Sequence, residues 1–380
     1  MTTAIDPVAL ARALIHCPSV TPRDEGAQAV LAEALETIGF AVSRHVWGEA
    51  PDGPVHNLFA RIGEGGPHFA FAGHTDVVPV GNREQWSVEP FAAEVRDGQL
   101  IGRGAADMKG AIAAFVAAAA RHGRPAKGSI SLVITGDEEG PATFGTKPLL
   151  DWMAATGNVP DVCLVGEPTS RQRLGDVVKI GRRGSVNVWL TVKGAQGHVA
   201  YPHMADNPVR HLINILHALQ SRQLDTGNAW FDPSNLEVTD IGVGNSATNV
   251  IPAVAEARLN IRFNDEHRGS DLVGWIESVA ARVSDGAEVV ARISGEAFLT
   301  EPGALSSLVA GAITAETRLV PEFSTSGGTS DARFIRRFCP VVEFGLPGQS
   351  MHKVDEHASI DDIALLSRIY GRVLAGFFAG

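Results

Sequence analysis

The sequence predicts an α/β protein in which a mixed sheet flanked by helices is interrupted by a smaller α+β unit. Three observations lead to this prediction. Short apolar runs such as residues 129–135 (SISLVIT) are typical of strands buried on both faces of a sheet, and helical patterns separate them. The pattern changes between residues 179 and 294, where helices and strands follow a different order. At 380 residues the chain is also too long for one ordinary core, so two domains are expected.

The first part of the chain, residues 1–178, supplies most of the expected main sheet. Asp6 followed by Pro7 is typical of a helix N-terminus, and Gly39 is typical of a helix end. The expected helices start at residue 6, cover 24–38 and follow residue 110, and the expected strands cover 41–46, 57–62, 69–79, 129–135 and 161–165.

The middle part, residues 179–294, reads as a separate inserted domain. Strands are expected over residues 177–192, 236–243, 250–264 and 287–293, and helices over 207–220 and 270–283. The resulting order β-α-β-β-α-β is that of a ferredoxin-like α+β unit, which forms a compact domain. Residues 295–380 then return to the first domain with a helix over 305–316 and a buried strand over 341–344.

Composition indicates a globular protein that does not bind nucleic acid. The chain is 44% hydrophobic and 20% charged, with a formal net charge of −11. Disordered chains have fewer apolar residues, and nucleic-acid surfaces need basic patches. An anionic small molecule could still bind in a locally basic pocket.

Cysteine usage and the N-terminus predict a cytoplasmic location without a membrane partner. Cys17, Cys163 and Cys339 are odd in number and far apart, which favours free thiols in a reducing compartment. No signal peptide is expected at the N-terminus. The apolar run at residues 111–120 is shorter than the ~20 residues that span a bilayer.

His74 and Asp76 end the apolar strand at residues 69–79. Side chains two apart in an extended chain share one side, so the pair can point the same way. A carboxylate beside a ligating histidine is a common way to fix the imidazole tautomer. Taken alone, the pair is more typical of a hydrogen-bonded turn, so its interpretation depends on further ligands.

Several other loops carry groups that can bind a metal ion. The set with His74 is Asp107, Glu138, Glu139, Glu167 and His352. Three of the loops follow apolar strands, and ligand sites in α/β sheets lie beyond the carboxyl ends of the strands. Asp107 precedes a helix and could instead be an N-cap. Histidine and carboxylate ligands without thiolates favour catalytic zinc. Because Glu138 and Glu139 are adjacent, one is expected to ligate and the other to act as a general base.

A set of motifs spread over nearly the whole chain resembles a family of dinuclear zinc amidohydrolases, which includes acetylornithine deacetylase, aminoacylases and glutamate-type carboxypeptidases. The motifs are PSVTP, GHTDVVP, GRGAADMKG, GDEEG, GEPT, GRRGS, GAQGHVAYPH, STSGGTSDARF and GQSMHKVDEH. The resemblance implies a zinc-peptidase-like main domain with two Zn²⁺ per subunit, at one of which Co²⁺ can substitute. It also implies that the inserted domain forms a homodimer and acts as a lid.

The resemblance assigns a role to each site residue. Asp107 would bridge the two metal ions, with His74 and Glu167 completing one site and Glu139 and His352 the other. The resemblance is also compatible with a cis peptide bond after Asp107. Glu138 would be the general base, and Asp76 would orient His74. His198, on the inserted domain, would reach across the dimer and stabilise the oxyanion.

Substrate recognition is expected to need groups that bind carboxylates. The candidates are Arg182, Ser185, Asn249, Arg262, Gly328 and Thr329. Arginine binds carboxylates bidentately, and the glycine-rich turn could hold an anion through its N–H groups. The adjacent Arg183 leaves open which arginine makes the contact.

The resemblance implies an acylated amino acid as the substrate and, through GRRGS and STSGGTSD, favours a succinylated one. Acetylornithine, another acyl amino acid or a dipeptide stays open. So does a binding protein that keeps the fold without chemistry, although such a protein would be expected to have lost some of the ligands.

Overall fold

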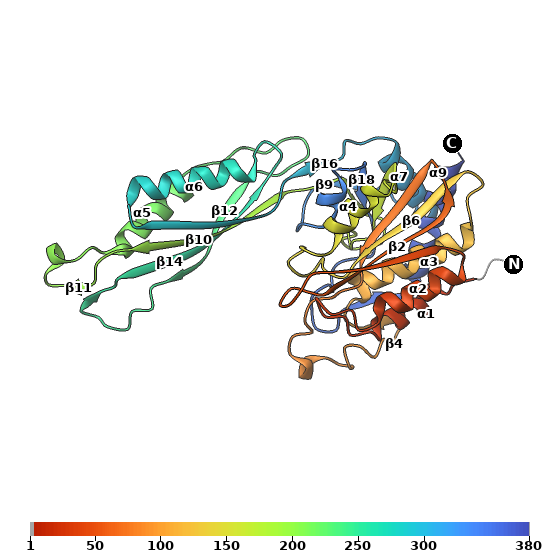
Figure 1. Cartoon of the computed structure of the whole chain (residues 1–380), viewed down its shortest axis with the longest axis horizontal. Coiled ribbons are helices and arrows are strands. Elements are labelled where there is room, and N and C mark those ends of the chain that lie inside the picture. The colour runs from red at the N-terminus through yellow and green to blue at the C-terminus, as the bar shows by residue number, and fades with distance from the viewer. Residues whose placement is uncertain (1–3, 380) are drawn as a thin grey trace. The chain divides into compact units, whose positions relative to one another are not determined.

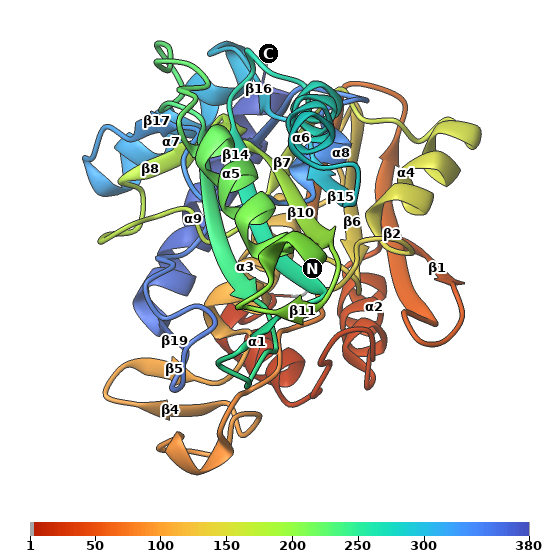
Figure 2. The same cartoon turned by 90° about the vertical axis from the view of Figure 1, so that its left-hand side faces the viewer.

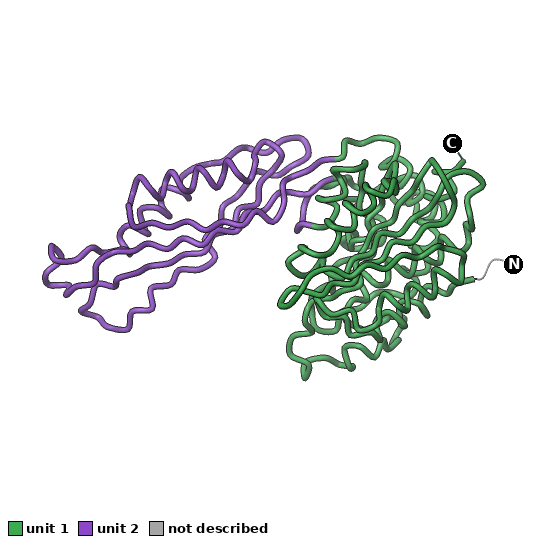
Figure 3. Tube along the Cα trace, viewed as in Figure 1, with its two compact units in different colours: residues 1–180, 300–324, 330–380 green, residues 181–299, 325–329 purple. Residues whose placement is uncertain are grey.

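The computed structural model describes residues 4–379, which divide into two compact units (Figure 3). Residues 1–3, the first part of the N-terminal stretch in which no signal peptide is expected, lie outside the described residues. Unit 2 consists of Gly181–Leu299 and Thr325–Thr329, and unit 1 contains the other described residues. The insertion thus extends beyond the expected limit at residue 294, because its last strand pairs with its first, Leu299 with Gly181.

Unit 1 is built on an eight-stranded mixed sheet (Figure 1). In hydrogen-bonding order its strands are β1 (Ala41–Trp47), β2 (Val55–Glu64), β6 (Gly128–Thr135), β3 (His68–His74), β7 (Val162–Val165), β18 (Val341–Glu343), β8 (Val177–Lys179) and β17 (Glu322–Ser324). The four neighbours β6, β3, β7 and β18 run parallel, whereas β2 is antiparallel to β6 and β8 to β18. The carboxyl ends of these four strands therefore meet at one edge of the sheet.

Helices cover both faces of this sheet. They are α1 (Pro7–Ile15), α2 (Ala27–Thr37), α3 (Gly110–His122), α4 (Thr146–Ala155), α7 (Ala304–Thr317), α8 (Ala332–Ile335) and α9 (Ile360–Phe378), with short turns η1 (Arg83–Gln85) and η2 (Ala105–Lys109). On one face Phe71 of β3 stacks on Phe115 of α3 at 4.2 Å and meets Tyr370 of α9 edge-on at 5.7 Å. On the other face Trp152 of α4 packs edge-on against Phe59 of β2 at 5.3 Å. None of the helices in the described residues has the length and apolar character needed to span a membrane.

A small three-stranded sheet joins two distant parts of unit 1. Strand β5 (Gln99–Ile101) pairs with β4 (Glu94–Arg96) on one side and with β19 (His357–Ser359) on the other. The pairing places the chain that precedes Asp107 beside the chain that follows His352.

Unit 2 has the predicted ferredoxin-like order (Figure 2). Its antiparallel sheet runs β12 (Asn235–Gly242), β14 (Val254–Phe263), β10 (Gly184–Lys193) and β15 (Ala287–Gly295), with helices α5 (Pro208–Gln220) and α6 (Gly269–Val283) on one face. Four short strands, β9 (Gly181–Arg182), β11 (Gly197–His198), β13 (Val250–Ile251) and β16 (Phe298–Leu299), and the turn η3 (Pro202–Met204) complete it. Alternate residues of β14 are buried under the helices, so the opposite face of the sheet carries mainly polar side chains.

Candidate metal centre

The five predicted metal ligands come together at the carboxyl edge of the sheet in unit 1. His74 is the last residue of β3, Glu139 follows β6 and Glu167 follows β7. Asp107 lies in η2, directly before α3, and His352 lies in the loop after β18. All five belong to unit 1.

Asp107 lies between the two histidines and contacts each with a different oxygen. Its Oδ1 is 3.2 Å from His74 Nε2, and its Oδ2 is 3.2 Å from His352 Nε2. Glu167 Oε1 lies 3.7 Å from His74 Nε2, and Glu139 Oε1 lies 2.9 Å from His352 Nε2. The side chains thus form two groups that share Asp107.

The chemistry of these donors fits two divalent cations. Five carboxylates, those of Asp76, Asp107, Glu138, Glu139 and Glu167, face only two imidazoles. Packing so many anions together is unfavourable unless cations compensate for them. Donor atoms of His74, Asp107 and Glu139, and likewise of His74, Glu138 and Glu167, lie within 4.8 Å of one another. Oxygen and imidazole donors at this spacing suit catalytic zinc and related ions.

Hydrogen bonds to Asp107 and Glu139 raise the pKa of His352 to about 10 in the metal-free protein. A histidine must lose its proton to bind a metal, so binding at this position releases a proton. The backbone of His352 has φ +63°, a left-handed conformation that few residues other than glycine adopt, and such positions are concentrated at functional sites.

Asp107 does not cap the helix, contrary to the alternative considered from the sequence. Helix α3 begins at Gly110 with Lys109 at its N-cap position, and no described side chain caps it. The Asp107–Met108 peptide is cis. The Asp107 carboxylate instead contacts the two histidines.

Two glycines make room for the side chain that follows Asp107. A Cβ at Gly73 would lie 2.5 Å from Met108 Cε, and one at Gly166 would lie 2.7 Å from the same atom. Each glycine directly precedes a ligand, His74 or Glu167. The absence of a side chain at these two positions therefore lets three ligand-bearing segments pack against one another.

Asp76 holds the site through the backbone as well as through its carboxylate. The main-chain oxygen of Asp76 accepts a hydrogen bond from His74 Nδ1 at 2.9 Å, which leaves Nε2 for a metal. The carboxylate is 3.6 Å from Nδ1 and accepts N–H groups from Glu138 at 3.3 Å and Glu139 at 3.0 Å. Asp76 therefore positions the two glutamates in addition to lying beside His74.

The two adjacent glutamates point to different neighbours. Glu139 contacts His352, whereas a carboxylate oxygen of Glu138 is grouped with His74 and Glu167. Loss of hydration in the recessed site raises the pKa of Glu138 well above its usual range, and the charge of Glu167 adds to this. A carboxylate with a raised pKa is suited to accept and return a proton.

The predicted substrate-binding residues, together with His198, belong to unit 2. Arg182 is buried, and its Nη1 donates to the carbonyl oxygen of Gly328 at 3.0 Å, so it is joined to the glycine-rich turn that contains Thr329. Arg183 and Arg262 form another pair: burial lowers the pKa of Arg262, and the charge of Arg183 lowers it further. The two adjacent arginines thus serve different parts of unit 2.

Ser185 and Arg262 face each other across β10 and β14, where they are register partners. Between them lies Asn260, which accepts a hydrogen bond from Arg262 Nε at 3.0 Å and donates to Ser185 Oγ at 3.4 Å.

His198 lies in an exposed two-stranded antiparallel ladder formed by β11 and β13. Its Nδ1 accepts the N–H of Ala200 at 3.1 Å, which places the ring proton on Nε2. Nε2–H is then available as a donor. The exposed Asn249 lies directly before β13, and its carbonyl accepts the N–H of Val199 at 3.1 Å.

The sequence analysis missed several buried charged residues, among them Arg103, Lys109 and Glu356. Lys109 Nζ donates to the carbonyl of Leu14 at 2.9 Å and to Ser19 Oγ at 2.8 Å. Ser19 belongs to the PSVTP motif, so this motif serves to anchor the segment beside Asp107. The only sequence signal for Glu356 was its place in the GQSMHKVDEH motif, four residues after His352.

Comparison with known proteins identifies the family. The profile of Peptidase family M20/M25/M40 matches residues 70–376, most of the chain. The chain belongs to this family. Membership confirms the predicted resemblance and the predicted class, a metal-dependent hydrolase.

Curated M20 relatives match the chain over almost its full length. Succinyl-diaminopimelate desuccinylase of Rhizorhabdus wittichii is 63% identical over 96% of both chains, and that of Novosphingobium aromaticivorans is 60% identical over 98% of both.

Solved M20 structures confirm the predicted fold class. A metallo-carboxypeptidase from Sulfolobus solfataricus has a TM-score of 0.78 at 14% identity, covering 99% of this chain and 100% of its own. A dinuclear metal-binding peptidase from Bacillus subtilis has a TM-score of 0.71 at 17% identity, covering 97% and 96%.

Proposed function

We propose that this M20 protein hydrolyses N-succinyl-L,L-2,6-diaminopimelate to succinate and L,L-2,6-diaminopimelate, in the synthesis of lysine and meso-diaminopimelate. The observation that carries the chemistry is the position of Asp107 between two groups of ligands, with Glu138 beside them. The choice of substrate is supported by full-length relatives at 63% and 60% identity that bear the name of this activity.

The metal ions would be held by two groups of residues that share Asp107. His74 and Glu167 complete one group, and Glu139 and His352 complete the other. Two Zn²⁺ ions, with Co²⁺ as a substitute at one position, would lower the pKa of a water molecule and polarise the scissile carbonyl.

Glu138 is the proton carrier of the reaction. It takes a proton from the attacking water and gives it to the leaving amine, so one carboxylate serves both steps. Its raised pKa makes it a better proton acceptor than an ordinary carboxylate. Asp76 holds the backbone of Glu138 in place for this transfer.

The substrate carries several carboxylates, and unit 2 offers two sites with arginines. Arg182 with Gly328 and Thr329 forms one, and Arg262 with Ser185 forms the other. A guanidinium binds a carboxylate through two parallel hydrogen bonds, so each site suits one end of the substrate. Asn249 would add an amide contact from the start of β13.

Unit 2 would form a homodimer that brings His198 of one subunit to the site of the other. Exposed apolar side chains close to His198 in sequence support a contact there: Val199 is 47% exposed, Tyr201 57% and Met204 73%. The Nε2–H of His198 would then donate to the developing oxyanion.

Three free cysteines support a reducing, cytoplasmic environment.

Substitution of Glu138 tests the chemistry. Glu138→Gln keeps the size of the side chain but cannot accept the proton, and removal of a general base lowers kcat by about 10²–10⁴-fold. Metal content by mass spectrometry should stay at the wild-type level. Retained activity in this variant would show that another group moves the proton.

Parallel kinetics test the substrate. We expect kcat/KM for succinyl-diaminopimelate to exceed that for acetylornithine by a wide margin. A preference for acetylornithine would keep the hydrolase class and replace the substrate.

Sedimentation of the active enzyme tests the dimer, since a fully active monomer would contradict a role for His198 across subunits.

A further inference from the structure

We propose that Glu356 and Arg103 form a buried brace that positions Asp107 between the two metal ions and fixes it relative to His352. Both are positioning residues, since they act through ligands and touch neither substrate nor metal. This inference rests on the metal site of the proposed function and goes beyond it in naming what holds the shared ligand in place.

Glu356 binds the backbone on either side of the peptide that leads into Asp107. Its Oε1 accepts the N–H of Ala106 at 3.0 Å and that of Asp107 at 3.1 Å. Its Oε2 accepts a hydrogen bond from Arg103 Nη1 at 2.7 Å. The Glu356 side chain is completely buried, so these three donors replace the water that an ionised carboxylate would otherwise bind.

The kink at Asp107 explains why such an acceptor is needed. Because Asp107 and Met108 are not helical, this turn does not continue the regular helical hydrogen bonding of α3. Buried N–H groups without partners are strongly unfavourable. Glu356 supplies one oxygen to both N–H groups, and this permits the backbone conformation that directs the Asp107 carboxylate at both histidines.

Arg103 connects the brace to the loop that carries His352. Its Nη1 also donates to the carbonyl of Lys353 at 3.1 Å, and its Nη2 donates to the carbonyl of Pro79 at 3.2 Å. The guanidinium lies 5.2 Å above the ring of Trp86 and is 2% exposed. Lys353 directly follows His352, so one guanidinium links both ligand loops to the chain that follows β3.

The arrangement is better explained by positioning than by stability. A buried ion pair is weak evidence for stability, because apolar residues of similar volume often serve as well. A metal site, in contrast, needs its ligands held to a fraction of an ångström. Asp107 and His352 come from segments about 245 residues apart in the sequence, and the brace spans the same two segments. Groups that orient metal ligands in this way typically affect metal affinity.

Metal affinity of Glu356→Gln tests the proposal. The amide keeps one oxygen but presents an NH₂ group either to Arg103 or to the two N–H groups, so one side of the brace loses its acceptor. Chelator-stripped protein would be titrated with Zn²⁺ in competition with a chromophoric chelator, at a temperature where circular dichroism shows it folded. We expect affinity to fall about 10–100-fold.

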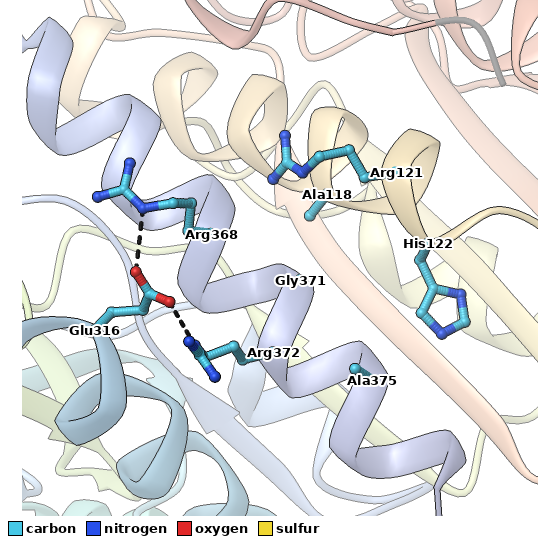
Figure 4. Close-up of a pocket in the computed structure, with 8 residues that line it drawn as sticks. All are labelled: Ala118, Arg121, His122, Glu316, Arg368, Gly371, Arg372 and Ala375. Atoms are coloured by element: carbon cyan, nitrogen blue, oxygen red, sulfur yellow. Dashed lines mark hydrogen bonds and ion pairs between the residues drawn. The ribbon is translucent and has the colours of Figure 1, made fainter.

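Glu316→Gln is the matched control. Glu316 of α7 is a partly buried glutamate in unit 1, and it accepts hydrogen bonds from Arg368 and Arg372 of α9, at a groove away from the metal ligands (Figure 4). The Zn²⁺ affinity of the Glu316→Gln variant should equal that of the wild type. If Glu356→Gln does not fold, Arg103→Lys takes its place, since it keeps the charge and loses the planar fork.

The possible results separate this inference from the proposed function. Wild-type Zn²⁺ affinity in a folded Glu356→Gln or Arg103→Lys variant would overturn the brace and leave the proposed function standing. Absence of Zn²⁺ binding by the wild-type protein would overturn the proposed metal site, and the brace with it. A drop in affinity in the brace variants, with none in Glu316→Gln, is the result that the brace predicts.

Discussion

The two sheets of this protein carry their polar groups in different places. In unit 1, strands β3 and β6 are buried along their whole length, and the candidate ligands His74 and Glu139 lie at or just beyond their carboxyl ends. In unit 2, buried and accessible residues alternate along β14, and the candidate substrate group Arg262 lies on the polar face of the sheet. The candidate functional groups of unit 1 thus lie at the carboxyl ends of its strands, whereas Arg262 of unit 2 lies on the face of its sheet.

The difference follows from what each sheet must bury. A mostly parallel sheet covered by helices on both faces has no side available for polar groups, so these collect in the loops at its edge. An antiparallel sheet covered on one face keeps the other for water or a ligand. Metal ligands at the strand ends of the helix-covered sheet are held by buried partners. Side chains on the open face of the antiparallel sheet are held by their neighbours on adjacent strands.

Among the substitutions that compare the two units, His198→Ala should give the largest effect, because it removes a donor proposed to act in the transition state. Loss of one such donor typically lowers kcat by about 10²–10³-fold, with a smaller change in KM. Stability should hardly change, since the side chain of His198 in β11 is exposed. Steady-state kinetics and calorimetry check both statements. An unchanged kcat would mean that His198 takes no part in the reaction, and that the reaction depends on the residues at the strand ends of unit 1.

Gly166→Ala tests how tightly that edge is packed. The new Cβ would lie 2.5 Å from Phe71 Cζ and 2.7 Å from Met108 Cε, both of them buried. Overpacking of this kind costs about 1–3 kcal/mol or more, and the shift should also weaken Zn²⁺ binding through Glu167.

The control for this variant is Gly274→Ala in helix α6 of unit 2. No atom lies within 4 Å of a Cβ built there, and alanine favours a helix over glycine by about 0.5–1 kcal/mol. A stabilised control beside a destabilised Gly166→Ala would attribute the loss to packing. Equal behaviour of both variants would contradict the close approach at Gly166.

Asp225→Asn probes the acid stability of unit 2. Although partial burial opposes it, hydrogen bonds from Ser234 and Gly227 lower the pKa of Asp225 to about 2. A carboxyl whose pKa is lowered on folding stabilises the protein above its unfolded pKa, and this contribution is lost as pH falls through the folded pKa. The variant should be less stable by about 1–2 kcal/mol near pH 6, and the difference should disappear near pH 2. A constant difference across this range would exclude a charge effect.

A matched pair of valine substitutions should give the smallest effects. Val133 of β6 is 3% exposed, whereas Val290 of β15 is 63% exposed. Val133→Thr buries a hydroxyl and should cost about 1–2 kcal/mol, while Val290→Thr should change stability by less than about 0.5 kcal/mol. Chemical denaturation of both variants measures the two changes in the free energy of unfolding. Equal changes would mean that Val133 and Val290 are equally buried in solution.

Local patterns predicted much of the fold. The Asp6–Pro7 helix start, the buried run in β6 and the alternation in unit 2 each depend on residues close in sequence, and each is present in the structure. Helix α9 was not predicted, although its Tyr370 helps to cover β3. The small sheet of β4, β5 and β19 was also missed. Its strand β19 joins β5 across more than 250 residues, whereas β4 and β5 form a local hairpin whose Asp97-Gly98 turn was overlooked.

The candidate ligands could be picked out because most stand at a strand end or before a helix, each within a distinct motif, and the structure brings them together. Glu356 could not, since a glutamate in a charged segment looks like a solvated one until its partners are known. The same holds for the contact between Met108 and the glycines, which depends on three loops meeting in space. Sequence therefore indicates which groups do the chemistry more readily than which groups hold them.

The five residues Thr325–Thr329 have a consequence for any attempt to cut the protein into parts. They lie in the return segment of the chain but belong to unit 2, where Thr325 donates to the carbonyl of Trp230 and Gly328 accepts from Arg182. A gene fragment covering residues 181–299 would encode the whole ferredoxin-like sheet yet leave Arg182 without this acceptor. Independent expression of the insertion should therefore include the short segment as a grafted loop or an added peptide, and complementation by that peptide would measure how much it contributes.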